Sequence, residues 1–124
     1  MIDMEAGEKR AGRRWRDYET AAGNRPVRDF IAALADDEVA DVVAAMKEIA
    51  RDGLSAARHL EGDIYEVHAT SERQSFRILF AKEGQRGQVL LALEGFSKKQ
   101  QKLPKRHLDL AKRRLADWRR RARA

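Results

Sequence analysis

Apolar residues recur at helical spacing in two consecutive stretches of the N-terminal half of the chain. The first stretch has them at positions i, i+3, i+4 and i+7, namely Val27, Phe30, Ile31 and Leu34. The second stretch continues this periodicity through Val39, Val42, Val43, Met46, Ile49 and Ala50. Asn24-Arg25-Pro26 is a typical helix start, and Gly53 suits the left-handed position that follows a helix. The pattern therefore predicts two amphipathic helices in succession.

The period changes from helical to alternating after Gly62. In residues 64–69, every second side chain shares one face, namely Ile64, Glu66 and His68. Residues 75–82 alternate in the same way, so Arg77 points to the opposite face from its neighbours Phe76 and Ile78. Residues 89–96 are almost all apolar, which predicts a strand covered on both faces. The connections are short, so we expect an antiparallel meander of three strands. Residues 14–20 are a weaker candidate strand because their alternation is poor.

A last helix is predicted from Pro104 onward. Its apolar positions form a narrow stripe at spacings of three and four, namely Leu108, Ala111, Leu115 and Trp118. We expect this stripe to dock on the body and to leave Lys105, Lys112, Arg113 and residues 119–121 available to solvent or to a polyanion. The element order is then β-α-α-β-β-β-α, an α+β fold with one domain over residues 13–124. Residues 1–12 lack periodicity and are expected to be flexible.

The net charge of +6 in 124 residues conceals a strong asymmetry. Residues 97–124 carry twelve Lys and Arg against two Asp, a net of +10, whereas the other 96 residues carry 14 basic and 18 acidic side chains, a net of −4. A basic segment on a mildly acidic body is typical of polyanion binders, because clustered cations release counterions from phosphates. A solvated charged helix is the alternative, and the two are about equally supported by the run alone.

Several classes of function are disfavoured by what the sequence lacks. There is no cysteine, which excludes disulfides and thiolate metal sites, and the three histidines at 59, 68 and 107 are too scattered to indicate a metal site. No apolar run reaches the roughly 20 residues needed to cross a bilayer. Glycine-rich phosphate loops, Gly-x-Ser-x-Gly elbows and helix-turn-helix signatures are also missing. We therefore expect a cytoplasmic protein that uses no metal or other cofactor and does not bind a membrane.

Three segments in a fixed order resemble a known family. They are HLEGDIYEVH (59–68), FRILFAK (76–82) and LLALEGFSKKQQKLPKRHLDLAKRRL (90–115). Together they resemble the phage-derived, HigB-like branch of the RelE/HigB toxin superfamily, whose members show Leu-x-x-Gly-x-x-Glu-Leu-Arg, then Tyr/Phe-Arg-Val-x-Tyr, then Gly-Phe-x-Lys-Lys-x-x-Lys-x-Pro before a helix with Ala-Lys-x-Arg. The matching positions are Leu60, Gly62, Glu66, Val67, Phe76, Arg77, Ile78, Gly95, Phe96, Lys98, Lys99, Lys102, Pro104, Ala111, Lys112 and Arg114. At one position the chain departs from the family, since His68 stands where the family usually has arginine.

The resemblance implies both a fold and an activity. The fold would be a small RelE-like α+β domain with two N-terminal helices, an antiparallel-rich twisted sheet and a basic C-terminal helix. The activity would be that of a metal-independent endoribonuclease that cuts mRNA in the ribosomal A site, by attack of a ribose 2′-OH on the adjacent phosphate. The resemblance also implies that the chain is the toxin of a type II toxin–antitoxin system. A cognate helix-turn-helix (HigA-like) antitoxin would hold it inactive, and the toxin would reach operator DNA only through that antitoxin.

Two other functions stay open from the residues. The chain is a catalytically silent RNA- or ribosome-binding module if the replacement of arginine by His68 abolished cleavage. A partner subunit of a larger assembly is the blander alternative, but it does not explain the +10 segment.

Candidate site residues follow from the motif positions. Arg77 suits a phosphate contact because its planar guanidinium binds two oxygens and stays charged; the alternative is a salt bridge to Glu66 or Glu94. His68 is a candidate general acid or base, or else a solvated strand residue, and Glu66 could orient it or bind a base edge. Lys98 is the fourth catalytic candidate, as a charge partner of the phosphate. The RNA-binding candidates are Lys99, Lys102, Lys105, Arg106, Lys112 and Arg113.

Overall fold

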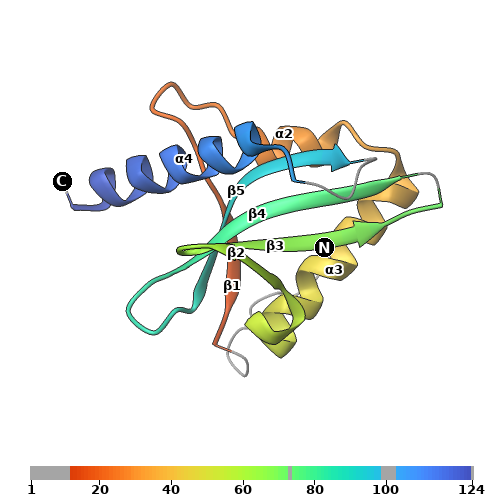
Figure 1. The fold of residues 1–124 in the computed structure, drawn as a ribbon, viewed down its shortest axis with the longest axis horizontal. Coiled ribbons are helices and arrows are strands. Elements are labelled where there is room, and N and C mark those ends of the chain that lie inside the picture. The colour runs from red at the N-terminus through yellow and green to blue at the C-terminus, as the bar shows by residue number, and fades with distance from the viewer. Residues whose placement is uncertain (1–11, 73, 99–102, 124) are drawn as a thin grey trace.

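The computed structural model describes residues 12–72, 74–98 and 103–123, so the expectation of a flexible segment over residues 1–12 lies outside the described residues except at Gly12. The elements are β1 (Arg14–Asp17), α2 (Pro26–Ala32), α3 (Asp36–Asp52), a short 3-10 turn (Leu54–Ala56), β2 (Arg58–Glu61), β3 (Ile64–Thr70), β4 (Ser75–Glu83), β5 (Val89–Lys98) and α4 (Lys105–Arg123) (Figure 1). The predicted α+β class is confirmed, with both N-terminal helices and the C-terminal helix. None of the helices in these ranges is long and apolar enough to cross a membrane.

The five strands form one mixed sheet in the order β1-β5-β4-β3-β2. The predicted antiparallel meander is confirmed as β3-β4-β5, whereas β1 joins its outer edge parallel to β5. Strand β2 was not predicted, because its sequence, RHLE, has a single apolar residue and no alternation. The hairpin with β3 makes it a strand, since its backbone pairs with residues 64–66.

Helices cover both faces of the sheet. Helices α2 and α3 lie on one face, over a core that includes Val67, Phe76, Ile78 and Phe80, and α4 lies on the other, over Ile64, Leu79, Leu91 and Leu93 (Figure 1). The alternation predicted for β3 and β4 is confirmed, because the odd and even positions fall into these two different cores. Strand β5 is buried between the two layers, as its apolar run predicts.

A β-bulge interrupts the pairing of β4 with β5. Leu79 pairs with Glu94 but the next residue, Phe80, pairs with Ala92, so Leu93 is an extra residue on β5. As a result both Leu93 and Glu94 face α4: Leu93 packs in the α4-side core, and the Glu94 carboxylate accepts hydrogen bonds from that helix. The bulge thereby directs a carboxylate to the helix, and it turns Gly95 toward α2.

Polar contacts, in addition to the apolar stripe, fix α4 to the body. The hydroxyl of Tyr18, just after β1, donates to Asp117 at 2.6 Å, and this hydrogen bond is the main reason that the pKa of Asp117 lies below its ordinary value. Arg119 pairs with Glu83 at 2.8 Å and with Asp63 at 3.0 Å. The prediction that residues 119–121 stay available is therefore wrong for Arg119, because these carboxylates of the sheet bind it; the two arginines that follow it pair with Asp117.

Replacing Gly95 by alanine is expected to destabilise the fold. A Cβ at this position would lie 2.6 Å from Cδ2 of Phe30 on α2, which is closer than Cβ atoms approach other atoms in proteins, and 3.1 Å from Cδ1 of Ile78, which is a tight contact. Overpacking of this kind costs about 1–3 kcal/mol. Urea denaturation should show this loss, and it should shrink in a Phe30→Leu background, where the ring is removed. An equal loss in both backgrounds would show that contact with Phe30 is not the reason for the glycine.

Candidate functional site

The register of the sheet places three side chains in one row on the face that α4 partly covers. His68 of β3 pairs with Arg77 of β4, and Arg77 pairs with Phe96 of β5. Side chains that are directly opposite on neighbouring antiparallel strands have Cβ atoms about 5 Å apart. In the adjacent row, Glu66 lies across from Leu79, and Leu79 across from Glu94. The alternation of β3 places Glu66 and His68 on one face, as predicted, and the register of β3 with β4 brings Arg77 beside them.

Arg77 is buried with few partners. Arg77 is 8% exposed and Glu66 is 2% exposed. Nη1 of Arg77 lies 3.7 Å from Oε1 of Glu66. That distance allows an ion pair but exceeds a normal hydrogen bond. Among the residues that the structure describes, the buried Nε of Arg77 has no hydrogen-bond partner. Of the two salt bridges left open by the sequence, the pair with Glu66 is therefore present, but it leaves the Nε donor of the guanidinium unsatisfied.

Glu94 is held by α4 instead. His107 Nδ1 lies 2.8 Å from its Oε2, and Arg114 donates from Nη1 to its Oε1 at 3.1 Å and to the carbonyl of Leu93 at 2.7 Å. The His107 ring stacks on Phe96, with centroids 3.8 Å apart and planes at 1°. These contacts fix the first turn of α4 beside the row that contains Arg77.

This cluster is missed by the sequence analysis, which considers His107 only as a metal ligand. The side chain is 17% exposed. A signal was present, because His107 and Arg114 are seven residues apart and so lie on one face of the helix, next to Ala111 of the apolar stripe. Nothing in the apolar run of β5, however, indicated the bulge that points Glu94 at them.

His68 lies at the surface, beside the buried Arg77. It is exposed, and its Nε2 is 3.4 Å from the Oγ1 of Thr70 on the same strand. A titratable imidazole next to a buried guanidinium provides a proton carrier beside an anion-binding group. Within the described ranges, no group of three or more His, Asp or Glu residues could hold a metal ion.

The predicted basic residues fall into three groups. Lys98 is the last residue of β5 and pairs with Ser75, which is two residues before Arg77 on β4. The side chain of Lys98 and the whole of Lys99 and Lys102 lie outside what the structure describes. Lys105 and Arg106 are exposed in the first turn of α4, next to His107. Lys112 and Arg113 are exposed further along the helix.

The last group is not brought to the row of Arg77. Lys112 lies seven residues beyond Lys105, about 10 Å along the helix axis, and it forms an ion pair with Glu61 of β2. The structure therefore places Lys105 and Arg106, but not Lys112, beside His107 and the row of Arg77.

A helix-covered five-stranded sheet with a buried arginine on one face defines the chain as a small α+β domain of the RelE-like type. The family described as "Phage derived protein Gp49-like (DUF891)" matches residues 29–116. The chain is also similar to two proteins named "Probable endoribonuclease HigB1", from Mycobacterium tuberculosis strains CDC 1551 / Oshkosh and ATCC 25618 / H37Rv. Each is 30% identical to this chain over 109 residues, which is 86% of this chain and 85% of the relative. The chain belongs to this phage-derived family and is a RelE/HigB-like toxin.

The pairing of Arg77 with Glu66 predicts an asymmetric response to mutation. Glu66→Ala removes the one carboxylate beside a buried charge, and breaking a buried pair in this way costs about 3–5 kcal/mol. Replacing both residues, as in Glu66→Leu/Arg77→Met, removes the charge as well and should leave the protein about as stable as the wild type. Chemical denaturation of the three proteins tests this. A double variant no more stable than Glu66→Ala would mean that the pair contributes to stability rather than costing it.

Proposed function

We propose that this chain is the toxin of a type II toxin–antitoxin system and a metal-independent endoribonuclease that cleaves mRNA on the ribosome, inhibiting translation and growth. The observation that carries the proposal is the buried, incompletely bonded guanidinium of Arg77 with His68 directly across from it. Similarity to two proteins named probable endoribonucleases supports the same activity.

The proposed reaction is attack of a ribose 2′-OH on the adjacent phosphate, with departure of the 5′-oxygen. It needs in-line geometry, stabilisation of the added charge on the phosphoryl oxygens, and two proton transfers. Arg77 meets the second need, because its charged guanidinium is held in place beside Glu66 and the described residues leave its Nε without an acceptor. A buried donor of this kind is more effective than one in water, since the surrounding dielectric is low.

His68 and Glu66 take different roles in this mechanism. His68 is exposed, and an imidazole can both accept and donate a proton, so it accepts the proton of the 2′-OH or returns one to the leaving oxygen. Glu66 is buried against Arg77, and we assign it the positioning of that guanidinium rather than contact with a base. The sequence-based alternative, in which Glu66 orients His68, is less supported because the contact that the structure gives for Glu66 is with Arg77.

Basic residues that follow the row in the sequence extend the proposed RNA contact. Lys98, Lys99 and Lys102 stand between the row and α4 in the sequence, and Lys105 and Arg106 lie in the first turn of that helix. Lys112 and Arg113 remain candidates for more distant RNA contacts. We further propose that a helix-turn-helix antitoxin holds the toxin inactive in the cytoplasm and is the route by which the complex reaches operator DNA.

Arg77→Ala is expected to abolish growth inhibition, because loss of one oxyanion donor lowers the cleavage rate by about 10²–10³-fold. Primer extension on mRNA from expressing cells should show new 5′ ends with the wild type and with Arg28→Ala, a control that removes an exposed arginine from α2. The ends should be absent with a folded Arg77→Ala protein. Full toxicity of that protein would refute the assignment, and binding to ribosomes without any cleavage by the wild type would instead support a silent RNA-binding module.

His68→Gln is expected to flatten the pH dependence of cleavage near neutral pH. Glutamine keeps the size and hydrogen-bonding capacity of the side chain but cannot carry a proton between groups. Single-turnover rates for the wild type and the variant should be compared between about pH 5 and pH 8, where histidine titrates. An unchanged rate and profile would remove His68 from the mechanism.

A further inference from the structure

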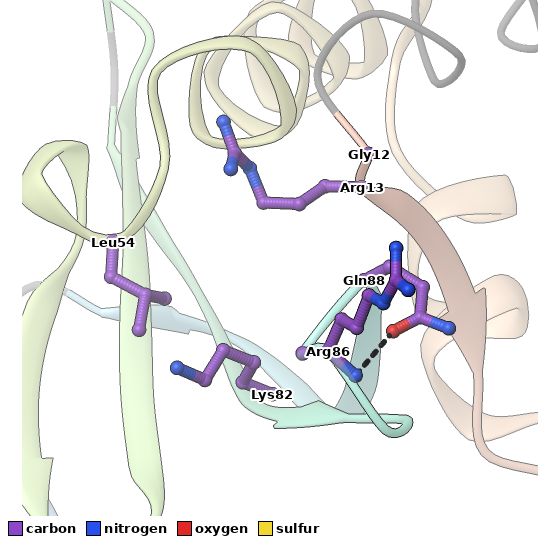
Figure 2. Close-up of a pocket in the computed structure, with 7 residues that line it drawn as sticks. Gly12, Arg13, Leu54, Lys82, Arg86 and Gln88 are labelled. Atoms are coloured by element: carbon purple, nitrogen blue, oxygen red, sulfur yellow. Dashed lines mark hydrogen bonds between the residues drawn. The ribbon is translucent and has the colours of Figure 1, made fainter.

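A hollow lined by cations lies at the opposite end of the sheet from the row of Arg77. It has a volume of about 610 Å³ and is lined by Gly12, Arg13, Leu54, Lys82, Arg86, Gly87 and Gln88. Figure 2 shows its three charged side chains coming from separate segments: the start of β1, the end of β4 and the turn before β5. Three of the seven lining residues are cationic and none is acidic.

Two of these cations are held in place by the fold. Arg13 donates from Nε to the carbonyl of Ala50 and from Nη2 to that of Arg51, each at 3.0 Å, so it caps the C-terminal turn of α3. The stem of Lys82 packs on Gly87, where a Cβ would lie only 2.5 Å from Cδ of the lysine. Positive charge in the hollow is therefore positioned before any ligand binds.

Two carboxylates of the described chain that lie near the hollow, those of Asp52 and Glu83, are bound to other cations. Asp52 lies near enough to Arg13 to be influenced by it, but its oxygens accept hydrogen bonds from Arg51 at 3.0 and 3.1 Å. Glu83, which follows Lys82 on β4, pairs with Arg119 of α4 on the other face of the sheet. An anion entering the hollow would meet Arg13, Lys82 and Arg86 without competition from these two side chains.

From this geometry we propose that the hollow is a second RNA-binding site, which holds backbone phosphates of an RNA segment other than the one cleaved. Lys82 is five residues from Arg77 along β4, about 17 Å at strand spacing, and faces the α3 side of the sheet rather than the α4 side. A short RNA bound at Arg77 would not reach it, so a folded RNA, as the ribosome presents, is the ligand. An acidic protein segment is less suited, because Leu54 is the single large apolar side chain in the lining and protein partners need apolar anchors. The choice of RNA rests on the proposed function.

The test is the salt dependence of binding to a fluorescently labelled RNA hairpin, measured by anisotropy in an Arg77→Ala background so that the probe is not cut. Lys82→Gln/Arg86→Gln removes two cations and leaves Arg13, which also caps α3. The matched control, Arg28→Gln/Lys47→Gln, removes one Arg and one Lys from α2 and α3. Two lost phosphate contacts should lower the slope of log affinity against log salt by about 1.5, whereas the control should keep the parent slope.

An unchanged slope in the hollow variant, or an equal change in both, would overturn the proposal. So would binding of a decaglutamate peptide that depends on Lys82 and Arg86 while the hairpin does not, since that result would assign the hollow to an acidic protein partner. Failure of the proposed function has a different signature, namely no Arg77-dependent mRNA ends in cells, and it leaves this binding measurement unaffected.

Discussion

The buried charge of Arg77 is the constraint on which the candidate site depends. Apart from Arg77 itself, Glu66 and Glu94, the buried residues of the described part of the sheet are apolar. Within the described part of the chain, the carboxylate of Glu66 lies 3.7 Å from the guanidinium. A buried pair with such geometry recovers little of the cost of desolvating two charges. An apolar pair would fill the same space at lower cost, so the structure retains an arginine that stability does not require. Incomplete bonding of a buried cation is understandable where a phosphate supplies the missing acceptors.

The position of Glu94 explains why Arg77 remains underpaired. Glu66 and Glu94 flank Leu79 in the row next to Arg77, and a guanidinium bound by both carboxylates would have few donors left. The bulge at Leu93 turns Glu94 toward α4, where His107 and Arg114 occupy its oxygens. The same helix that closes this face of the core therefore removes the competing carboxylate. Docking of α4 and availability of Arg77 are in this way coupled through one irregularity in β5.

The sequence predicted those features that depend on local periodicity. Alternation in β3 placed Glu66 and His68 on one face, alternation in β4 separated Arg77 from Phe76 and Ile78, and the helical stripes located α2, α3 and α4. Features that depend on long-range pairing were not predicted. Strand β2 has no apolar alternation, β1 gave no sign of its parallel partner, and the uniform apolar run of β5 hid the bulge. The candidate residues of the site could thus be named from the sequence. The register and the bulge that leave Arg77 beside Glu66, and turn Glu94 away from it, could not be predicted.

Net charge along the sequence also proved a poor guide to the charged surface. The +10 segment lies on a body of net −4, and folding brings the two together: Arg114, Lys112 and Arg119 pair with Glu94, Glu61 and Glu83. Within the described part of α4, Lys105, Arg106 and Arg113 are exposed and form no ion pair. In the hollow, by contrast, Arg13, Lys82 and Arg86 lie outside the +10 segment, and they meet only in the folded chain. The positive potential at the surface therefore depends on which lysines and arginines are paired with carboxylates in the folded chain. Their frequency along the sequence does not show this.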